Sequence, residues 1–204
     1  MSVTLSQAQV RVGAGFVHDM RTTSYSTNSN VFYSASGSTV IPLSGFYAGL
    51  TFSLDLGAVT FDPGVYYSLT TGERKTLDEI DEIITGTVTE HNITVPMHFN
   101  YGVDLGSAVR LSVYAGPSVE VGLSSTYKID TSSFGIVHLD DATDMYEDSD
   151  YSRLDILAGA GLAVDLFDMF RISVGYDFGL LDRNKADNCS VRDRILHAGI
   201  AFLF

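Results

Sequence analysis

Histidine and cysteine, the side chains that most often carry out catalysis or bind metals, are few and scattered in this sequence. It holds five histidines and one cysteine in 204 residues. His91 and His18 each have a polar neighbour, but neither begins a His-x-Ser arrangement of the kind that a triad of His, Ser and an acid could use. No Gly-x-Ser-x-Gly occurs either. Cys189 has no cysteine to pair with, so we expect a free thiol in a loop and no catalytic residue in the chain.

Carboxylates gather in one segment of the second half of the chain. They are Asp140, Asp141, Asp144, Glu147, Asp148 and Asp150. Carboxylate oxygens suit Ca²⁺ or Mg²⁺, but the spacing is not that of an EF-hand loop. We therefore interpret the segment as a solvated acidic loop, with weak divalent-cation binding as the alternative. The sequence predicts no dedicated metal site and no cofactor.

The overall composition limits the class of protein further. A net charge of −13 excludes a nucleic-acid-binding protein, which needs a basic surface. Apolar residues make up 45% of the chain, yet no run of about 18 of them occurs, so a membrane-spanning helix is not expected. Tyr and Phe are frequent and Pro is rare, as is typical of an aromatic-rich sheet protein.

Eight segments alternate between large apolar residues and small or polar ones, which is the period of a β-strand with two different faces. They are Val10–Met20, Phe46–Leu56, Val59–Leu69, Asn92–Val103, Val109–Leu123, Arg153–Leu166, Phe170–Leu180 and Arg194–Phe204. Segments of about ten residues are long enough for a tilted strand to cross a bilayer. The sequence therefore predicts an eight-stranded antiparallel β-barrel.

The polar face of these segments indicates which side points inward. Glycines lie almost wholly on that face, where Lys and Glu would dominate if it met water. They are Gly13, Gly15, Gly49, Gly64, Gly102, Gly116, Gly122, Gly159, Gly161, Gly175, Gly179 and Gly199. Glycine weakens a strand, but a narrow eight-stranded lumen leaves space only for filling side chains and explains the small residues. We therefore place the polar face inside and the apolar face against lipid.

Charged side chains and two histidines then share the lumen. The predicted set is Arg11, Arg110, Arg153, Arg171, Asp19, Asp55, Asp62, Asp104, Glu120, Asp155, Asp165, Asp177, His98 and His197. Buried charges must pair or stay hydrated, because desolvating one alone costs several kcal/mol. A salt-bridged plug is the main interpretation, and a small gated pore or a proton-accessible pathway is the alternative.

Connections of two lengths join the segments. Those at residues 56–58, 104–108 and 167–169 are short, whereas 21–45, 70–91, 124–152 and 181–191 are long. Short periplasmic turns and long extracellular loops are typical of transmembrane barrels. Within the second long loop, residues 76–86 combine a capping box of Thr76 and Glu79 with apolar residues at helical spacing. They predict a short amphipathic helix that either caps the barrel mouth or binds a partner.

The span from residue 9 to 204 resembles the small eight-stranded bacterial outer-membrane β-barrel proteins of the OmpA-barrel and OmpX type. The resemblance implies a cell outer membrane location in a Gram-negative bacterium, with lipid and lipopolysaccharide as surroundings. It also implies that the alternating segment ending at Phe204 is recognised by the barrel-assembly machinery. It carries over no site residues. Ser6-Gln7-Ala8 resembles a signal-peptidase cleavage triplet, so residues 1–8 are interpreted as a signal-peptide remnant or a frayed N-terminus, and 9–204 as one barrel domain.

The function expected from these features is a structural or surface-interaction role, without catalysis, with an extracellular ligand possible at the loops. The first alternative is a narrow porin-like channel. The second is an enzyme that modifies lipid A, because such enzymes exist on eight-stranded outer-membrane barrels.

Overall fold

The computed structural model describes residues 9–28, 34–77, 83–133, 136–139, 143–147, 151–184 and 189–204. Every regular element in these residues is a β-strand. None of the described residues forms a helix long and apolar enough to span a membrane. Residues 1–8 lie outside the described residues, so the division into residues 1–8 and 9–204 stays a prediction.

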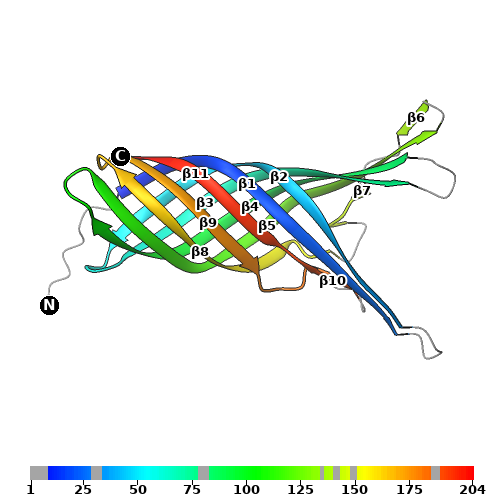
Figure 1. The fold of residues 1–204 in the computed structure, drawn as a ribbon, viewed down its shortest axis with the longest axis horizontal. Coiled ribbons are helices and arrows are strands. Elements are labelled where there is room, and N and C mark those ends of the chain that lie inside the picture. Colours follow the sequence, from blue (N-terminus) through cyan, green and yellow to red (C-terminus); the bar gives the residue numbers. More distant parts are fainter. Residues whose placement is uncertain are drawn as a thin grey trace.

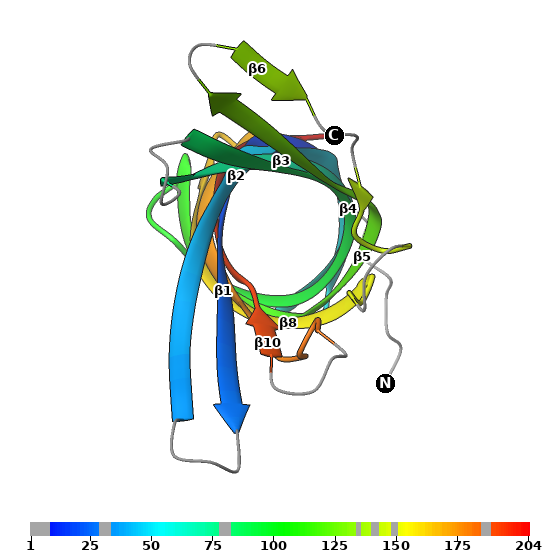
Figure 2. The same cartoon turned by 90° about the vertical axis from the view of Figure 1, so that its right-hand side faces the viewer.

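A single antiparallel sheet closes on itself to form the barrel (Figures 1 and 2). Within the described residues its ring contains eight strands: β1 (Gln9–Asn28), β2 (Ser34–Asp55), β3 (Thr60–Leu77), β4 (Ile83–Asp104), β5 (Val109–Ser133), β8 (Leu154–Leu166), β9 (Phe170–Gly179) and β11 (Arg194–Leu203). Three shorter strands attach to the ring: β6 (Ile136–Leu139), β7 (Thr143–Asp144) and β10 (Cys189–Arg192). The fold class predicted from the alternation, an eight-stranded antiparallel up-and-down barrel, is confirmed.

Closure of the ring depends on β1, which pairs with β2 on one side and β11 on the other. Gly15, for example, lies opposite Tyr47 of β2 and Gly199 of β11. At the end of the barrel where the short turns lie, the N–H of Phe204 donates to the carbonyl of Val10 at 2.9 Å. The ring therefore leaves no unpaired edge through its membrane-spanning part, as a barrel in lipid requires.

The two faces of the strands have the predicted directions. Large apolar side chains on the outer face are exposed in the isolated molecule, among them Val113, Leu162 and Ile172, each at least half exposed. Their sequence neighbours on the inner face are buried, as Ser112 shows. Because alternate residues point to opposite faces, this pattern sets a lipid-facing surface against a polar lumen.

Lumen glycines make space for large side chains from neighbouring strands. A Cβ added to Gly161 would collide with the ring of Tyr114, and one added to Gly199 would collide with the hydroxyl of Tyr47. Each tyrosine therefore lies flat over a glycine, which lets an aromatic ring fit inside a narrow barrel. This contact is the physical reason for the one-sided distribution of glycines in the sequence.

Three tight turns connect strands at one end of the barrel, which we call the turn end (Figure 1). Gly57 and Gly106 have φ values of +96° and +84°, which glycine adopts without steric cost. The third turn places Phe167 and Asp168 at φ values of +55° and +53°, and the N–H of Met169 donates to the carbonyl of Leu166. These φ values and this hydrogen bond are those of a type I′ turn over residues 166–169, within a three-residue connection between the paired Leu166 and Phe170, and a phenylalanine at positive φ is unusual.

The opposite, loop end differs from the sequence-based expectation, because the strands continue well past the predicted membrane-spanning segments. β1 and β2 stay paired out to Asn28 and Ser34, so most of the expected 21–45 loop is a hairpin that projects from the barrel (Figure 1). The helix predicted for residues 76–86 is wrong: Thr76 pairs with Ile84 and Leu77 with Ile83, and residues 78–82 lie outside the described part. The β-branched residues at 83–85 favour the strand, and the cross-strand ladder outweighs the local helical spacing.

Candidate functional site in the lumen

Ion pairs fill the lumen near the turn end. Arg11 donates to Asp62 at 2.8 Å, and Arg171 contacts both Asp62 at 3.3 Å and Asp165 at 2.6 Å. Asn100 donates to the same oxygen of Asp62 at 3.0 Å. These side chains come from strands far apart in the sequence and are buried or nearly so, so they connect opposite walls of the barrel. We call Arg11, Asp62, Asp165 and Arg171 the turn-side layer.

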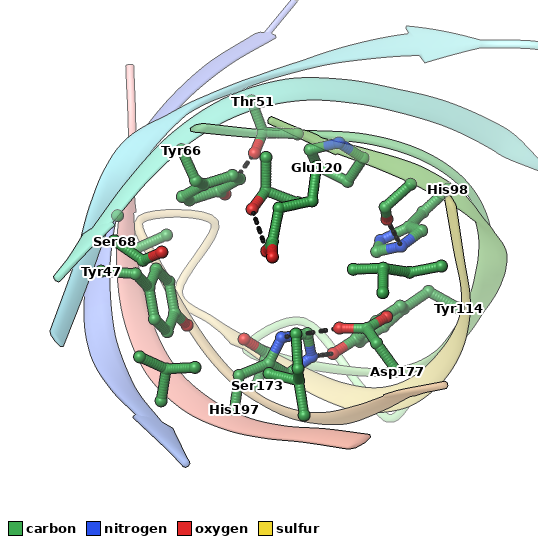
Figure 3. Close-up of a pocket in the computed structure, with 18 of the residues that line it drawn as sticks. Tyr47, Thr51, Tyr66, Ser68, His98, Tyr114, Glu120, Ser173, Asp177 and His197 are labelled. Carbon is green, nitrogen blue, oxygen red and sulfur yellow. Dashed lines mark hydrogen bonds and ion pairs between the residues drawn. The ribbon is translucent and has the colours of Figure 1, made fainter. Parts of the chain in front are cut away.

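A cavity of about 150 Å³ lies in the middle of the lumen. Figure 3 shows tyrosine, histidine and acidic side chains pointing into it from all around the wall. Its lining includes Tyr47, Tyr66, His98, Tyr114, Asp177 and His197. The cavity is lined by polar side chains and is large enough to hold ordered water. We call it the chamber.

The two predicted lumen histidines both line the chamber and both contact Tyr114. His197 lies 3.4 Å from Asp177 through Nδ1 and 3.2 Å from the Tyr114 hydroxyl through Nε2. His98 stacks on the Tyr114 ring and lies within hydrogen-bonding distance of Ser118 at 3.3 Å. An imidazole between a carboxylate and a hydroxyl can pass a proton between them. Among the described residues, Ser118 contacts the other histidine, His98, and not the His197 of the Asp177–His197 pair.

An apolar cluster forms part of the chamber wall. Val17, Leu157 and Ile195 point inward from three strands, and each is at most 7% exposed, with Tyr47 packed against them. Alternation along the strands puts all three at inward positions, although their type suggests the lipid face. These apolar side chains narrow the lumen, and they need no hydrogen-bond partners there.

A second set of ion pairs closes the lumen at the loop end. Arg21 contacts Glu90 through two nitrogens, at 2.6 and 2.7 Å, and Asp193 through Nε at 2.9 Å. The Ser125 hydroxyl donates a further hydrogen bond to the Glu90 carboxylate at 2.7 Å. A bidentate guanidinium–carboxylate pair is the most geometrically specific of ionic contacts.

Arg183, from the segment after β9, completes this arrangement. Its side chain is fully buried; it contacts Asp193 at 2.6 Å and donates to the Tyr146 hydroxyl at 2.9 Å. The Tyr151 ring lies against both arginines, 4.6 Å from the guanidinium carbon of Arg183 and 5.2 Å from that of Arg21. Two arginines from separate elements therefore share one carboxylate under an aromatic ring. We call Arg21, Glu90, Arg183 and Asp193 the loop-side layer.

Asp193 lies between β10 and β11, outside the predicted membrane spans, and its ionisation depends on this contact. Burial alone would raise the pKa of its carboxyl, but the charges and hydrogen bonds of Arg21 and Arg183 lower that pKa to about 2. The carboxylate therefore stays ionised at any physiological pH, and the loop-side layer remains intact.

Some predicted lumen charges lie elsewhere. Arg153 precedes β8, where it is exposed, donates to the Leu123 carbonyl and covers the Tyr146 ring. The remaining three lie at the turn end, near the ends of their strands: Asp55 and Asp104 are exposed, and Arg110 is half-buried. Arg110 and Asp104 form an open pair at 3.4 Å. The other predicted lumen charges, Asp19, Glu120, Asp155 and Asp177, are buried within the barrel.

The acidic segment is described only in part. Asp144 accepts a hydrogen bond from the N–H of Tyr146 at 2.8 Å and begins a turn that reaches Glu147. Asp140, Asp141, Asp148 and Asp150 lie outside the described residues. Among the residues that are described, no three His, Cys, Asp or Glu side chains are placed to hold a metal ion. Weak divalent binding by this loop stays a prediction.

The loop-side layer was missed by the sequence analysis. Arg21, Glu90, Arg183 and Asp193 all fall in segments interpreted as loops or at their borders. Arg21 is two residues beyond Asp19 and Glu90 two before Asn92, so both continue the inward positions of their strands. Extending the alternation past the apolar segments would have found these two. Arg183 follows the end of β9, and no sequence periodicity indicates its inward direction.

A polar lumen, an apolar outer face and an asymmetric pair of ends together define a barrel that spans a membrane. A family model described as outer membrane protein beta-barrel domain matches residues 6–183. The chain belongs to this family. It is therefore an outer-membrane protein of a Gram-negative bacterium, as expected from its resemblance to the small eight-stranded barrels.

Similar solved structures include three outer-membrane proteins. Ail, the attachment invasion locus protein of Yersinia pestis, is 16% identical, with 98% of this chain and 100% of Ail covered and a TM-score of 0.45. Neisserial surface protein A is 15% identical (96% and 97% covered, TM-score 0.43), and OprG from Pseudomonas aeruginosa is 11% identical (98% and 97%, TM-score 0.48). No curated protein sequence matches the chain.

Proposed function

We propose that this protein is a closed outer-membrane barrel with a structural or surface-interaction role, and that it neither conducts solutes nor catalyses a reaction. The loop-side layer is the observation that carries the proposal. Arg21 and Arg183 bind Glu90 and Asp193 across the lumen at 2.6–2.9 Å, and all four side chains are at most 5% exposed. Ions would have to separate these pairs to pass, which costs several kcal/mol for each charge left unpaired.

The projecting β1–β2 hairpin supports a surface role. Beyond the barrel, Val40 lies on its outer face and Tyr25 on its inner face, and each is at least half exposed. Apolar and aromatic side chains on a protruding extracellular ribbon suit contact with another molecule. We place the proposed extracellular ligand at this hairpin. The outer face of the strands meets lipid and lipopolysaccharide, and Phe204, three-quarters exposed on that face, would be read by the barrel-assembly machinery.

An activity on lipid A is less well supported. On the outer face, His18 and Ser44 lie 2.8 Å apart, which is the distance of a nucleophile and its base. Among the described residues, however, no carboxylate contacts His18, and the backbone donors around it are engaged in the β-ladder. The pair therefore lacks an orienting acid and an oxyanion hole.

Conductance in planar lipid bilayers tests the closed-barrel proposal. We expect no stable conductance from the purified wild-type protein. The double variant Arg21→Ala with Arg183→Ala should show opening events, because it removes both cations from the loop-side layer. Arg110→Ala is the matched control, since its exposed pair at the turn end does not cross the lumen.

Steady conductance of the wild-type protein would contradict the closed-barrel proposal and favour the channel. Circular dichroism and heat-dependent gel mobility of the same samples establish that each variant is folded. Mass spectrometry of lipid A from cells with and without the protein tests the absence of catalysis. A mass change that is lost in Ser44→Ala would show that the protein modifies lipid A.

A further inference from the structure

The inner face of the strands changes character beyond the loop-side layer. Within the membrane its residues are mostly polar or glycine. Beside Arg21 and Glu90 the same inward positions carry Leu43 and Ile41 on β2, opposite Asp19 and Arg21, and Val88 on β4, two residues beyond Glu90. Leu43 is fully buried and Val88 is 5% exposed. An apolar wall at this place is not required by lipid, because it faces the barrel axis.

These side chains surround a second cavity of about 480 Å³. Small-molecule sites in proteins typically measure 300–1,000 Å³ and are mostly apolar with a few polar groups. The apolar lining here is Ile41, Leu43, Val88, Met145, Tyr151 and Val191, and Cys189 lies at the same wall. We call this cavity the vestibule.

The floor of the vestibule carries charge that is already neutralised. All three guanidinium nitrogens of Arg21 contact carboxylates, Nε with Asp193 and the two terminal nitrogens with Glu90. Arg21 therefore has little attraction left for an anion that enters from outside. An uncharged occupant avoids the cost of desolvating a second charge beside these pairs.

One polar group at the vestibule stays unsatisfied by the protein. Tyr151 is 6% exposed and lines the cavity, yet its hydroxyl has no hydrogen-bond partner among the described residues. A buried hydroxyl without a partner costs about 1–3 kcal/mol. The oxygen itself has almost no accessible surface, so a ligand must displace a neighbouring side chain slightly to reach it, and then recovers that cost. The ring of Tyr151 is fixed between Tyr146 and the two arginines, which holds the hydroxyl in place.

We infer that the vestibule binds a small, uncharged, largely apolar molecule with one hydrogen-bonding group, held by the aliphatic wall and by the Tyr151 hydroxyl. This site lies above the closed lumen and does not require passage through the barrel. It is also distinct from the exposed side chains of the β1–β2 hairpin, so it goes beyond the proposed surface role.

Occupancy of the vestibule can be measured by the rate of labelling of Cys189, because this residue lines the vestibule and is the only cysteine in the chain. The full protein in phosphatidylcholine nanodiscs is labelled with N-ethylmaleimide, and the rate is followed by mass spectrometry. We expect 1-naphthol to slow the labelling in a saturable way. The anion 1-naphthalenesulfonate, of the same ring system, should leave the rate unchanged within twofold.

Two pairs of variants separate the vestibule from general binding. Val88→Phe fills the cavity and should raise the half-saturating concentration of 1-naphthol at least tenfold, whereas Thr87→Phe, on the outer face of the same strand, should not change it. Tyr151→Phe should raise that concentration about fivefold, the worth of one hydrogen bond. The same variant should leave protection by naphthalene, which has no hydroxyl, unchanged.

A thiol at a different position serves as the control for a general effect of 1-naphthol dissolved in the lipid. In a Cys189→Ser background, Ser38→Cys places a thiol on the exposed outer face of the hairpin, where 1-naphthol should not slow labelling. The inference is overturned if the sulfonate protects as well as 1-naphthol, if Val88→Phe and Thr87→Phe behave alike, or if labelling at position 38 slows equally. Absence of any saturable protection of Cys189 overturns it as well.

Discussion

Arg21 contacts carboxylates from two other elements and is 5% exposed, so its removal leaves charges that water cannot reach freely. We expect Arg21→Met to lower the free energy of unfolding by about 3–5 kcal/mol, since breaking one side of a buried pair strands the partner. Urea unfolding in lipid vesicles, followed by tyrosine fluorescence, measures the change. Arg110→Met should cost less than about 1 kcal/mol, because that pair is exposed at the turn end.

A double variant distinguishes the stranded charge from lost packing. Arg21→Met combined with Glu90→Gln should recover part of the stability that Arg21→Met loses, because the uncompensated carboxylate becomes neutral. If the two changes simply add, the ion pair contributes nothing specific and the plug interpretation of the loop-side layer is wrong.

Asp193 gives the loop-side layer a defined response to acid. Its pKa in the folded protein is lowered to about 2, below the ordinary value of 3.8, so its ionised form stabilises the fold. That stability is fully present above about pH 4 and is lost as the pH falls towards 2. One pKa unit corresponds to about 1.4 kcal/mol, so the loss should reach about 2 kcal/mol. Asp193→Asn should be less stable at pH 6 and should lose less stability between pH 4 and pH 2, as measured by urea unfolding at each pH.

At the scale of single elements, the turn between β8 and β9 stores local strain. Phe167 and Asp168 both have positive φ, a conformation that costs an ordinary residue about 1 kcal/mol. The double variant Phe167→Asn with Asp168→Gly introduces the Asn-Gly pair that this turn type prefers, and should stabilise the barrel by about 1–2 kcal/mol. Thermal unfolding in detergent measures the effect. Phe167→Ala is the control: without a residue that tolerates positive φ, it should give no gain.

The strands that could be predicted from sequence are those that meet lipid. Alternation located all eight because lipid demands an apolar residue at every second position, as Val113 and its cross-strand partner Leu162 illustrate. Beyond the bilayer that demand ends, and the continuing strands carry ordinary polar residues. Residues 76–86 show the consequence: their local spacing fits a helix, but Thr76 and Leu77 pair with Ile84 and Ile83 and so extend the β3–β4 ladder beyond the barrel. Such pairing is not encoded in local periodicity.

The part of the candidate site that lies on the lipid-facing segments could also be predicted from alternation. Charges on the inner face of the lipid-facing segments, such as Asp62 and Arg171, could be assigned to the lumen from alternation alone. Their pairing partners could not, because the contact depends on strand tilt and register around the ring. Arg183 was out of reach altogether, since it enters the lumen from an irregular segment whose direction only the folded protein fixes.

The two faces of one barrel wall should respond differently to the same new charge. Leu162 and Val113 lie opposite each other on the lipid face, each about half exposed in the isolated molecule. Leu162→Arg should cost about 2–4 kcal/mol near the bilayer midplane. Ser173→Arg should cost less, because Ser173 lines the chamber beside Asp177 (Figure 3). Urea unfolding in lipid vesicles compares the two, and equal costs would contradict the assignment of inside and outside.

For the molecule as a whole, the turn-side layer, the chamber with the apolar cluster in its wall, and the loop-side layer fill the lumen. Each layer joins strands that are distant in sequence, as the contact of Arg171 with Asp62 does. The interior can therefore be completed only once the ring has closed. Closure in turn requires β11 to pair with β1, which brings the last strand beside the first. Assembly in cells thus depends on delivering the last strand correctly.

Phe204 is the residue at which this dependence can be measured. Its side chain is 75% exposed and contacts the ring of Phe202 at 4.8 Å between centroids. Its removal should therefore lower stability by no more than about 1.5–3 kcal/mol, the value of one fully buried apolar side chain. If Phe204 is read by the assembly machinery, Phe204→Ala should refold in detergent nearly as well as the parent, yet accumulate unfolded in the periplasm of cells. Phe170→Ala, an aromatic change on the same lipid face, is the matched control and should reach the surface normally. Normal surface levels of Phe204→Ala would contradict this role and leave Phe204 as one more lipid-facing aromatic.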